Sequence, residues 1–229
     1  MTSENISKNL QKMRMKIRLA EEHYKRLPGS VQLLAVSKQQ SVEKIQLAIA
    51  EGQAHFGENY LQESLPKIAV LKKFSLKWHF LGHIQSNKTR QIAQHFDWVH
   101  SLDRIVVAQR LDAQRPEHLP PLNVCIEINI SQKASKFGVS LQALIPLAQE
   151  ITTLKRLRLR GLMVIPEPDH DFETQFLGYQ RIQKIQQDLC EQGYMLDTLS
   201  MGMSNDFTAA IGAGSTIVRV GTAIFGCRA

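Results

Sequence analysis

The sequence predicts a (β/α)8 barrel, in which parallel strands and helices alternate and the sheet closes on itself. After a first helix, short strand-like segments alternate with helical ones about eight times, and such alternation requires a parallel sheet. The segments Val124–Ile130 and Leu157–Val164 are rich in β-formers, as strands buried on both faces are. The alternative is an open doubly wound sheet, which the lack of a Gly-x-Gly-x-x-Gly motif after the first strand disfavours.

The first helix covers about residues 1–27 and has an apolar stripe at helical spacing, which we expect to pack on the barrel. The predicted strands are Val31–Ser37, His55–Gly57, Trp78–Leu81, Trp98–Ser101, Val124–Ile130, Leu157–Val164, Leu196–Leu199 and Ile217–Val220. The predicted helices between them are Val42–Glu51, Asn59–Leu71, Ser86–His95, Arg104–Asp112, Leu141–Thr152, Phe172–Glu191 and Phe207–Gly212. Proline clusters fall only in loops, so residues 1–229 are expected to form one domain.

The composition is 43% hydrophobic, enough for a sizeable core, and no apolar run reaches the ~20 residues of a membrane span. The polar N-terminus lacks the apolar region of a signal peptide. Cys125, Cys190 and Cys227 are odd in number and form no Cys-x-x-Cys, which disfavours a disulfide framework or a structural zinc site. We therefore expect a cytoplasmic protein that is not bound to a membrane.

The net charge of +7 comes largely from the first helix. A basic helix can bind nucleic acid, or it can simply be a solvated helix face. No aromatic residues are interleaved with the charges, as a stacking surface for bases would need. The solvated face is therefore the favoured interpretation, and no nucleic-acid partner is expected.

Lys38 ends the first predicted strand, which places its stem in a low dielectric and its amine at the mouth of a pocket. Desolvation disfavours the ammonium form, and a neutral amine is what Schiff-base chemistry with a carbonyl requires. The alternative is a surface lysine that begins a loop.

Two segments near the C-terminus end in small, hydroxyl-bearing residues after a strand. In the first, Ser204 or Asn205 is the expected N-cap of a short helix, and a helix N-terminus is an anion site that suits phosphate. In the second, Gly221 and Thr222 give a place where the backbone can approach a ligand closely. The alternative is two ordinary strand-to-helix turns.

Closure of the barrel places the first strand beside the eighth, so Lys38 would lie next to the phosphate-binding loops that follow strands seven and eight. An amine beside a phosphate site is the layout for pyridoxal 5′-phosphate (PLP) held as an aldimine. Arg219, two residues before Gly221, can point inward at the pyridine nitrogen. The alternative role for Arg219 is to cover the end of the barrel.

The segments Ala35–Lys38, His55–Tyr60 and Trp78–Lys88, with the two C-terminal segments, resemble the pyridoxal phosphate homeostasis proteins. That family resembles the N-terminal barrel domain of alanine racemases. The resemblance implies that Lys38 carries the aldimine and that Arg219 faces the ring nitrogen. It also implies a set of further cofactor-binding residues, which are Asn59, His83, Met163, Ser200, Ser204, Gly221 and Thr222.

Five other residues leave alternatives open. His79 and His83 would share one face of a strand, where a metal pair is conceivable but a core or pocket role is favoured, since no further ligands lie at suitable spacing. Glu58 could be a general base, but a Glu at a helix start is more often a partner of the helix dipole. Lys133 stands where the family commonly has an acidic residue, and the role of Lys136 stays open.

Alanine racemases have a second, β-rich domain that supplies the opposing acid/base, and the present sequence is expected to lack it. Racemisation needs groups on both faces of the substrate. The sequence therefore predicts a monomeric, non-catalytic carrier that binds PLP and passes it to apo-enzymes. The alternatives are a small racemase-like enzyme and, less favoured, a nucleic-acid-binding module.

Overall fold

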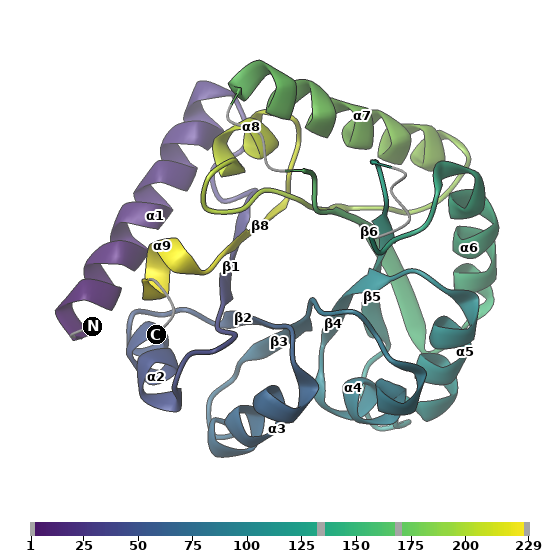
Figure 1. The fold of residues 1–229 in the computed structure, drawn as a ribbon, viewed down its shortest axis with the longest axis horizontal. Coiled ribbons are helices and arrows are strands. Elements are labelled where there is room, and N and C mark those ends of the chain that lie inside the picture. The colour runs from purple at the N-terminus through teal and green to yellow at the C-terminus, as the bar shows by residue number, and fades with distance from the viewer. Residues whose placement is uncertain (1–2, 132–135, 168–170, 227–229) are drawn as a thin grey trace.

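The computed structural model describes residues 3–131, 136–167 and 171–226 and contains a closed, all-parallel eight-stranded barrel with helices on its outside (Figure 1). This confirms the predicted fold class. The strands are β1 (Gln32–Val36), β2 (His55–Glu58), β3 (Lys77–Phe80), β4 (Trp98–Leu102), β5 (Leu122–Ile128), β6 (Leu157–Val164), β7 (Thr198–Ser200) and β8 (Ile217–Val220).

The helices lie close to their predicted positions. They are α1 (Ser3–His23), α2 (Val42–Ala50), α3 (Leu61–Val70), α4 (Thr89–His95), α5 (Ile105–Gln114), α6 (Leu141–Thr153), α7 (Phe172–Glu191), α8 (Phe207–Gly212) and α9 (Thr222–Phe225), with a 3-10 turn η1 (Ser86–Lys88) before α4. The helix α9 was not predicted, because four residues are too few to show a periodic pattern.

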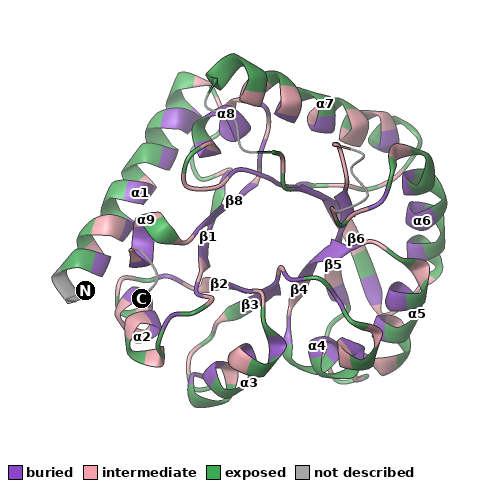
Figure 2. Cartoon of the chain, in the orientation of Figure 1, coloured by how far each residue is buried: buried purple, intermediate pink, exposed green. Residues whose placement is uncertain are grey.

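The helix α1 lies beside α2, α8 and α9 on the outside of the barrel (Figure 1). Its side chains Ile6, Leu10, Met13 and Ile17 are buried, and its opposite face is exposed (Figure 2). Two basic residues of this region have structural roles. Arg14 of α1 donates to Glu51 O and Gln53 Oε1, and Arg26, which follows the helix, donates to Ile211 O and Ser215 O. In the described part of the chain, no helix is long and apolar enough to cross a membrane.

Strand register brings the two ends of the chain together. In the β1–β8 pair, Leu34 lies opposite Arg219 and Ala35 opposite Val220. In the β1–β2 pair, Val36 lies opposite Gly57. The loop that carries Lys38 therefore leaves the barrel next to the loop that begins at Gly221, at the carboxyl ends of the strands, where (β/α)8 barrels carry their sites.

Candidate functional site

A pocket of about 430 Å³ lies at the carboxyl ends of the strands. Seven of the nine residues predicted for the site line it, and these are Lys38, Asn59, Met163, Ser204, Arg219, Gly221 and Thr222. Its remaining lining residues are Val36, Gln40, Leu81, Ile165, Pro166, Glu167, Gln175, Met203, Asn205, Asp206 and Gly226. Some of the lining residues, such as Ile165 and Asn205, are exposed and form the rim of the pocket.

Lys38 is half-buried, two residues beyond the end of β1. On one side of it, Ser37 O accepts from Lys67 Nζ at 2.8 Å and Ser37 Oγ donates to Glu58 Oε1 at 2.6 Å. On the other side, Gln39 has a φ of 60°, and its N–H donates to Glu63 Oε1. A non-glycine residue in the left-handed region needs support from its surroundings. The backbone is therefore fixed on both sides of the lysine.

Glu58 belongs to this support and does not line the pocket. Its carboxylate is fully buried, and its Oε1 lies 2.9 Å from Lys67 Nζ. Burial raises the pKa of Glu58, and the Lys67 charge opposes that rise. The interpretation of Glu58 as a helix-dipole partner is wrong, because α3 begins only at Leu61 and the carboxylate is held inside the protein.

The loop between β7 and α8 is organised by Asp206. Its Oδ1 accepts from Met203 N–H and its Oδ2 accepts from Tyr179 Oη at 2.9 Å. The expected N-cap at Ser204 or Asn205 is wrong, because α8 begins at Phe207 and Asp206 occupies the N-cap position. Ser204 instead reaches the pocket from the middle of the loop.

The loop after β8 comes very close to β1. A Cβ on Gly221 would lie 3.2 Å from Val36 O, which leaves little room for a side chain. Ile224 N–H and Phe225 N–H donate to Gly221 O, so the N–H groups of Thr222 and Ala223 precede the first intrahelical bond of α9. Gly221 and Thr222 line the pocket, so the Thr222 N–H, which makes no intrahelical bond, belongs to that lining.

Arg219 reaches the pocket from the barrel interior, where its side chain is buried. Its Nη1 donates to both the carbonyl O and the Oγ of Ser200, and its Nη2 donates to Val164 O at 2.9 Å. Burial lowers the pKa of Arg219, although a guanidinium keeps its proton at any ordinary pH. The Nε–H and the second Nη2 hydrogen take no part in these bonds, so they can serve a ligand.

The structure does not bring Ser200 to the pocket. Ser200 is the last residue of β7 and its side chain is fully buried in the barrel, where Oγ contacts Arg219 and lies 2.7 Å from His100 Nδ1. A hydroxyl committed to these two groups supports Arg219 and is not available to a phosphate in the pocket.

His83 also lies outside the pocket lining. The strand β3 ends at Phe80, and the chain then packs so tightly that a Cβ on Gly82 would lie 2.0 Å from Asn59 O. His83 therefore does not share a face with His79, and its ring stacks on Phe137 with centroids 4.0 Å apart. His79 lies inside the barrel. Among the described residues, no group of three or more potential ligands could hold a metal ion.

Several lining residues were missed by sequence reasoning, including Gln40, Met203 and Asp206. They lie in loops, which carry no periodic signal, and only their position just after a strand end could have suggested them. Lys136 lies near this rim, with its Nζ 3.7 Å from Glu167 Oε1. Lys133 lies outside the described residues.

Comparison with known proteins identifies the relatives of this chain. A family model described as the N-terminal domain of alanine racemase matches residues 8–229. The chain is 52% identical over 223 residues to the pyridoxal phosphate homeostasis protein of Pseudomonas aeruginosa, covering 97% of this chain and 96% of the relative. It is 48% identical over 227 residues to the protein of the same name from Escherichia coli K12, with 98% and 97% covered.

The chain belongs to the pyridoxal phosphate homeostasis protein family. Its fold matches PipY of Synechococcus elongatus, solved without PLP, at a TM-score of 0.85 and 36% identity, with 96% of this chain and 100% of PipY covered. The structure of PipY with PLP bound matches at a TM-score of 0.84 and 35% identity. Alanine racemase from Clostridium difficile matches at a TM-score of 0.71 but only 16% identity over 57% of its length, so that likeness concerns the fold alone.

Proposed function

We propose that this member of the pyridoxal phosphate homeostasis family binds PLP reversibly and serves vitamin B6 and amino-acid homeostasis as a carrier of the cofactor. The observation that carries the proposal is the convergence of Lys38, Arg219, Gly221 and Thr222 on one pocket. PLP requires an amine for its aldehyde, donors for its phosphate and a partner for its ring nitrogen.

The pocket has further polar groups that suit such a ligand. Asn59 Oδ1 is buried and has no hydrogen-bond partner within the described residues, although Asn59 lines the pocket. A buried acceptor without a partner is costly unless a ligand or water supplies a donor. In the proposed complex, Lys38 forms the covalent aldimine, Ser204, Gly221 and Thr222 hold the phosphate, and the Arg219 donors face the ring nitrogen. A guanidinium at that position opposes protonation of the ring.

Two observations favour a carrier over a racemase. Lys38 and Arg219 are the only lysine and arginine in the described lining of the pocket. Of the two carboxylates in that lining, Asp206 is bonded to Met203 N–H and Tyr179, and Glu167 Oε1 lies 3.7 Å from Lys136 Nζ. Racemisation requires proton transfer on both faces of the substrate. The exposed side chains at the rim also suit a cofactor that must leave the pocket again. We propose that the protein is a monomer in the cytoplasm and passes PLP to apo-enzymes.

The test is the absorbance of purified protein with added PLP, before and after borohydride, for the wild type and for Lys38→Ala. We expect a yellow band that borohydride removes, with the phosphopyridoxyl group attached to Lys38 in the wild type and absent in the variant. Lys136→Ala is the matched control, a lysine near the same rim, and should behave like the wild type. Equal labelling of Lys38→Ala and wild type would refute the assignment of Lys38.

The enzyme alternative has its own measurement. The loaded protein is incubated with L-alanine in deuterated water, and the α-proton signal is followed by NMR. Loss of that signal at a rate proportional to protein concentration would contradict the carrier proposal and favour a racemase-like enzyme.

A further inference from the structure

Three histidines from neighbouring strands form a hydrogen-bonded column inside the barrel. His55 Nδ1 lies 3.0 Å from His79 Nε2, and His79 Nδ1 lies 2.9 Å from His100 Nε2. His100 Nδ1 lies 2.7 Å from Ser200 Oγ, which also accepts from Arg219 Nη1 at 2.9 Å. The column runs from the first residue of β2 to the arginine of the pocket, and none of the three histidines lines the pocket.

The arginine determines which atoms donate along the column. Arg219 has no acceptor, so Ser200 Oγ must accept from it. The Ser200 hydroxyl is fully buried and needs an acceptor for its own hydrogen. Among the described residues, the other hydrogen-bond neighbour of Ser200 Oγ is His100 Nδ1. His100 Nδ1 therefore accepts, and a neutral His100 must carry its hydrogen on Nε2.

The tautomer of His100 determines the tautomer of the next histidine in the column. His100 Nε2–H donates to His79 Nδ1, so His79 carries its hydrogen on Nε2 and donates to His55 Nδ1. Burial and the Arg219 charge lower the pKa of His100 to about 3, and burial lowers the pKa of His79 well below its ordinary value. Both rings are thus neutral, and the hydrogen bonds point in one direction from Arg219 to His55.

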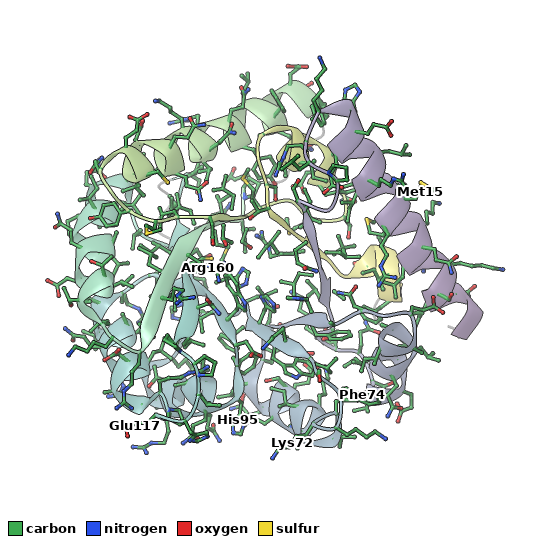
Figure 3. All side chains as sticks on the ribbon, turned by 180° about the vertical axis from the view of Figure 1, so that it is seen from behind. Met15, Lys72, Phe74, His95, Glu117 and Arg160 are labelled. Atoms are coloured by element: carbon green, nitrogen blue, oxygen red, sulfur yellow. The ribbon has the colours of Figure 1, made fainter. Side chains whose placement is uncertain are left out.

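The column is also held by packing at its middle histidine, His79. The His79 ring stacks on Trp98 with centroids 5.5 Å apart, and the Arg160 guanidinium lies 4.7 Å from the Trp98 ring. Arg160 is labelled on β6 in Figure 3, among the side chains that fill the barrel. Such packing limits the rotation of His79, so it favours a single arrangement of hydrogen bonds.

We propose that His100 and His79 are positioning residues for Arg219. The column fixes the Ser200 hydroxyl as an acceptor for Arg219 Nη1. It thereby holds the Arg219 Nε–H and the remaining Nη2 hydrogen toward a ring nitrogen in the pocket. The proposal rests on the proposed function, because PLP supplies that nitrogen. It adds that the rate at which PLP leaves the protein depends on two histidines that do not contact the cofactor.

The first arm of the test needs no cofactor. Two-dimensional NMR of the apoprotein labelled with ¹⁵N-histidine reports the tautomer of each ring. We expect His79 and His100 to be neutral with the hydrogen on Nε2, without titration between about pH 5.5 and 8.5. A hydrogen on His100 Nδ1, or protonation of either ring in that range, would overturn the column.

The second arm is a double-mutant cycle on the rate at which PLP leaves the protein, with Ser200→Ala, His100→Leu and the double variant. Each single change should raise the rate about five-fold, the effect of one lost hydrogen bond. The double variant should be no faster than the faster single one, because His100 acts through Ser200. Additive effects would show that His100 has only a structural role.

Two further variants separate positioning from loss of packing. His100→Asn keeps an acceptor near Nδ1 and should restore most of the slow release. Val99→Ala truncates a fully buried side chain on the same strand as His100 that does not line the pocket, so it should lower thermal stability without changing the rate of PLP release.

If wild type takes up no PLP, the proposed function fails while the NMR arm still tests the column. If wild type binds PLP and His100→Leu releases it at the wild-type rate, the column proposal fails alone.

Discussion

Two buried glutamates of the barrel differ in whether an oppositely charged side chain lies beside them. Lys67 holds Glu58, whereas Glu127 on β5 has no oppositely charged side chain within ion-pair distance among the described residues. Burial, with repulsion from Asp103, raises the pKa of Glu127 to about 7, and Arg219 only partly opposes that rise. At the residue scale, Glu127 is therefore a buried acid that folding prefers to keep protonated.

This predicts a pH-dependent stability. Because the folded-state pKa of Glu127 lies above its unfolded value, its contribution is fully present below about pH 4.5 and is lost as the pH rises through about 7. Glu127→Gln removes the ionisation, so the variant should gain up to roughly 3 kcal/mol over wild type between pH 4.5 and 8. Urea unfolding at several pH values measures this. A constant difference between the two proteins would contradict it.

At the scale of elements, α1 covers the side of the barrel where the short α8 and α9 lie, and its buried stripe is part of the core. Leu10 is fully buried while Met15, on the same helix, is 56% exposed. The basic face is solvated, and Arg14 and Arg26 tie α1 and the turn after it to backbone carbonyls. These contacts indicate that α1 contributes to the stability of the barrel.

Truncating the buried face of α1 should therefore destabilise the whole protein. Leu10→Ala should cost about 2 to 5 kcal/mol, the range for a large core side chain reduced to alanine. Met15→Ala is the control on the exposed face and should change the free energy of unfolding by less than about 0.5 kcal/mol. Both values come from urea unfolding curves, and equal costs at the two sites would contradict the packing of α1.

At the scale of the whole molecule, barrel closure depends on close contact between β6 and β7. Gly161 on β6 faces the backbone of β7, and a Cβ there would lie 1.7 Å from Thr198 O. No side chain fits without separating the two strands. The pocket depends on the same closure, because β7 carries Ser200 and β8 carries Arg219.

Gly161→Ala should therefore impair folding of the entire barrel, with a loss of at least about 3 kcal/mol, since backbone atoms would have to move. Gly178 in α7 is the matched control, because a Cβ there meets nothing within 4 Å. Gly178→Ala should raise stability by up to about 1 kcal/mol through helix propensity. Circular dichroism during thermal unfolding distinguishes the two, and a folded Gly161→Ala protein of wild-type stability would refute this account of closure.

Much of the fold followed from local signals. The alternation of strand and helix periods predicted the barrel, and the predicted bounds of β6, α7, α8 and β8 agree with the structure. Seven predicted site residues meet at one pocket because strand ends of a closed barrel share one edge. Ser200 and His83 do not, because the strand ends differ from the predicted ones by one residue: Ser200 is still part of β7, with its side chain inside the barrel, and β3 already ends at Phe80, so His83 lies in the following loop.

The sequence by itself determined the fold class and predicted the place of the candidate site with its amine, arginine and backbone donors, since these depend on local periodicity and on the residues that follow strands. Tertiary structure decided the direction of each side chain. Only closure of the barrel turned Ser200 toward Arg219 and aligned His55, His79 and His100, which lie on three strands. Hydrogen bonds between strands far apart in sequence depend on register and packing, which no local pattern specifies.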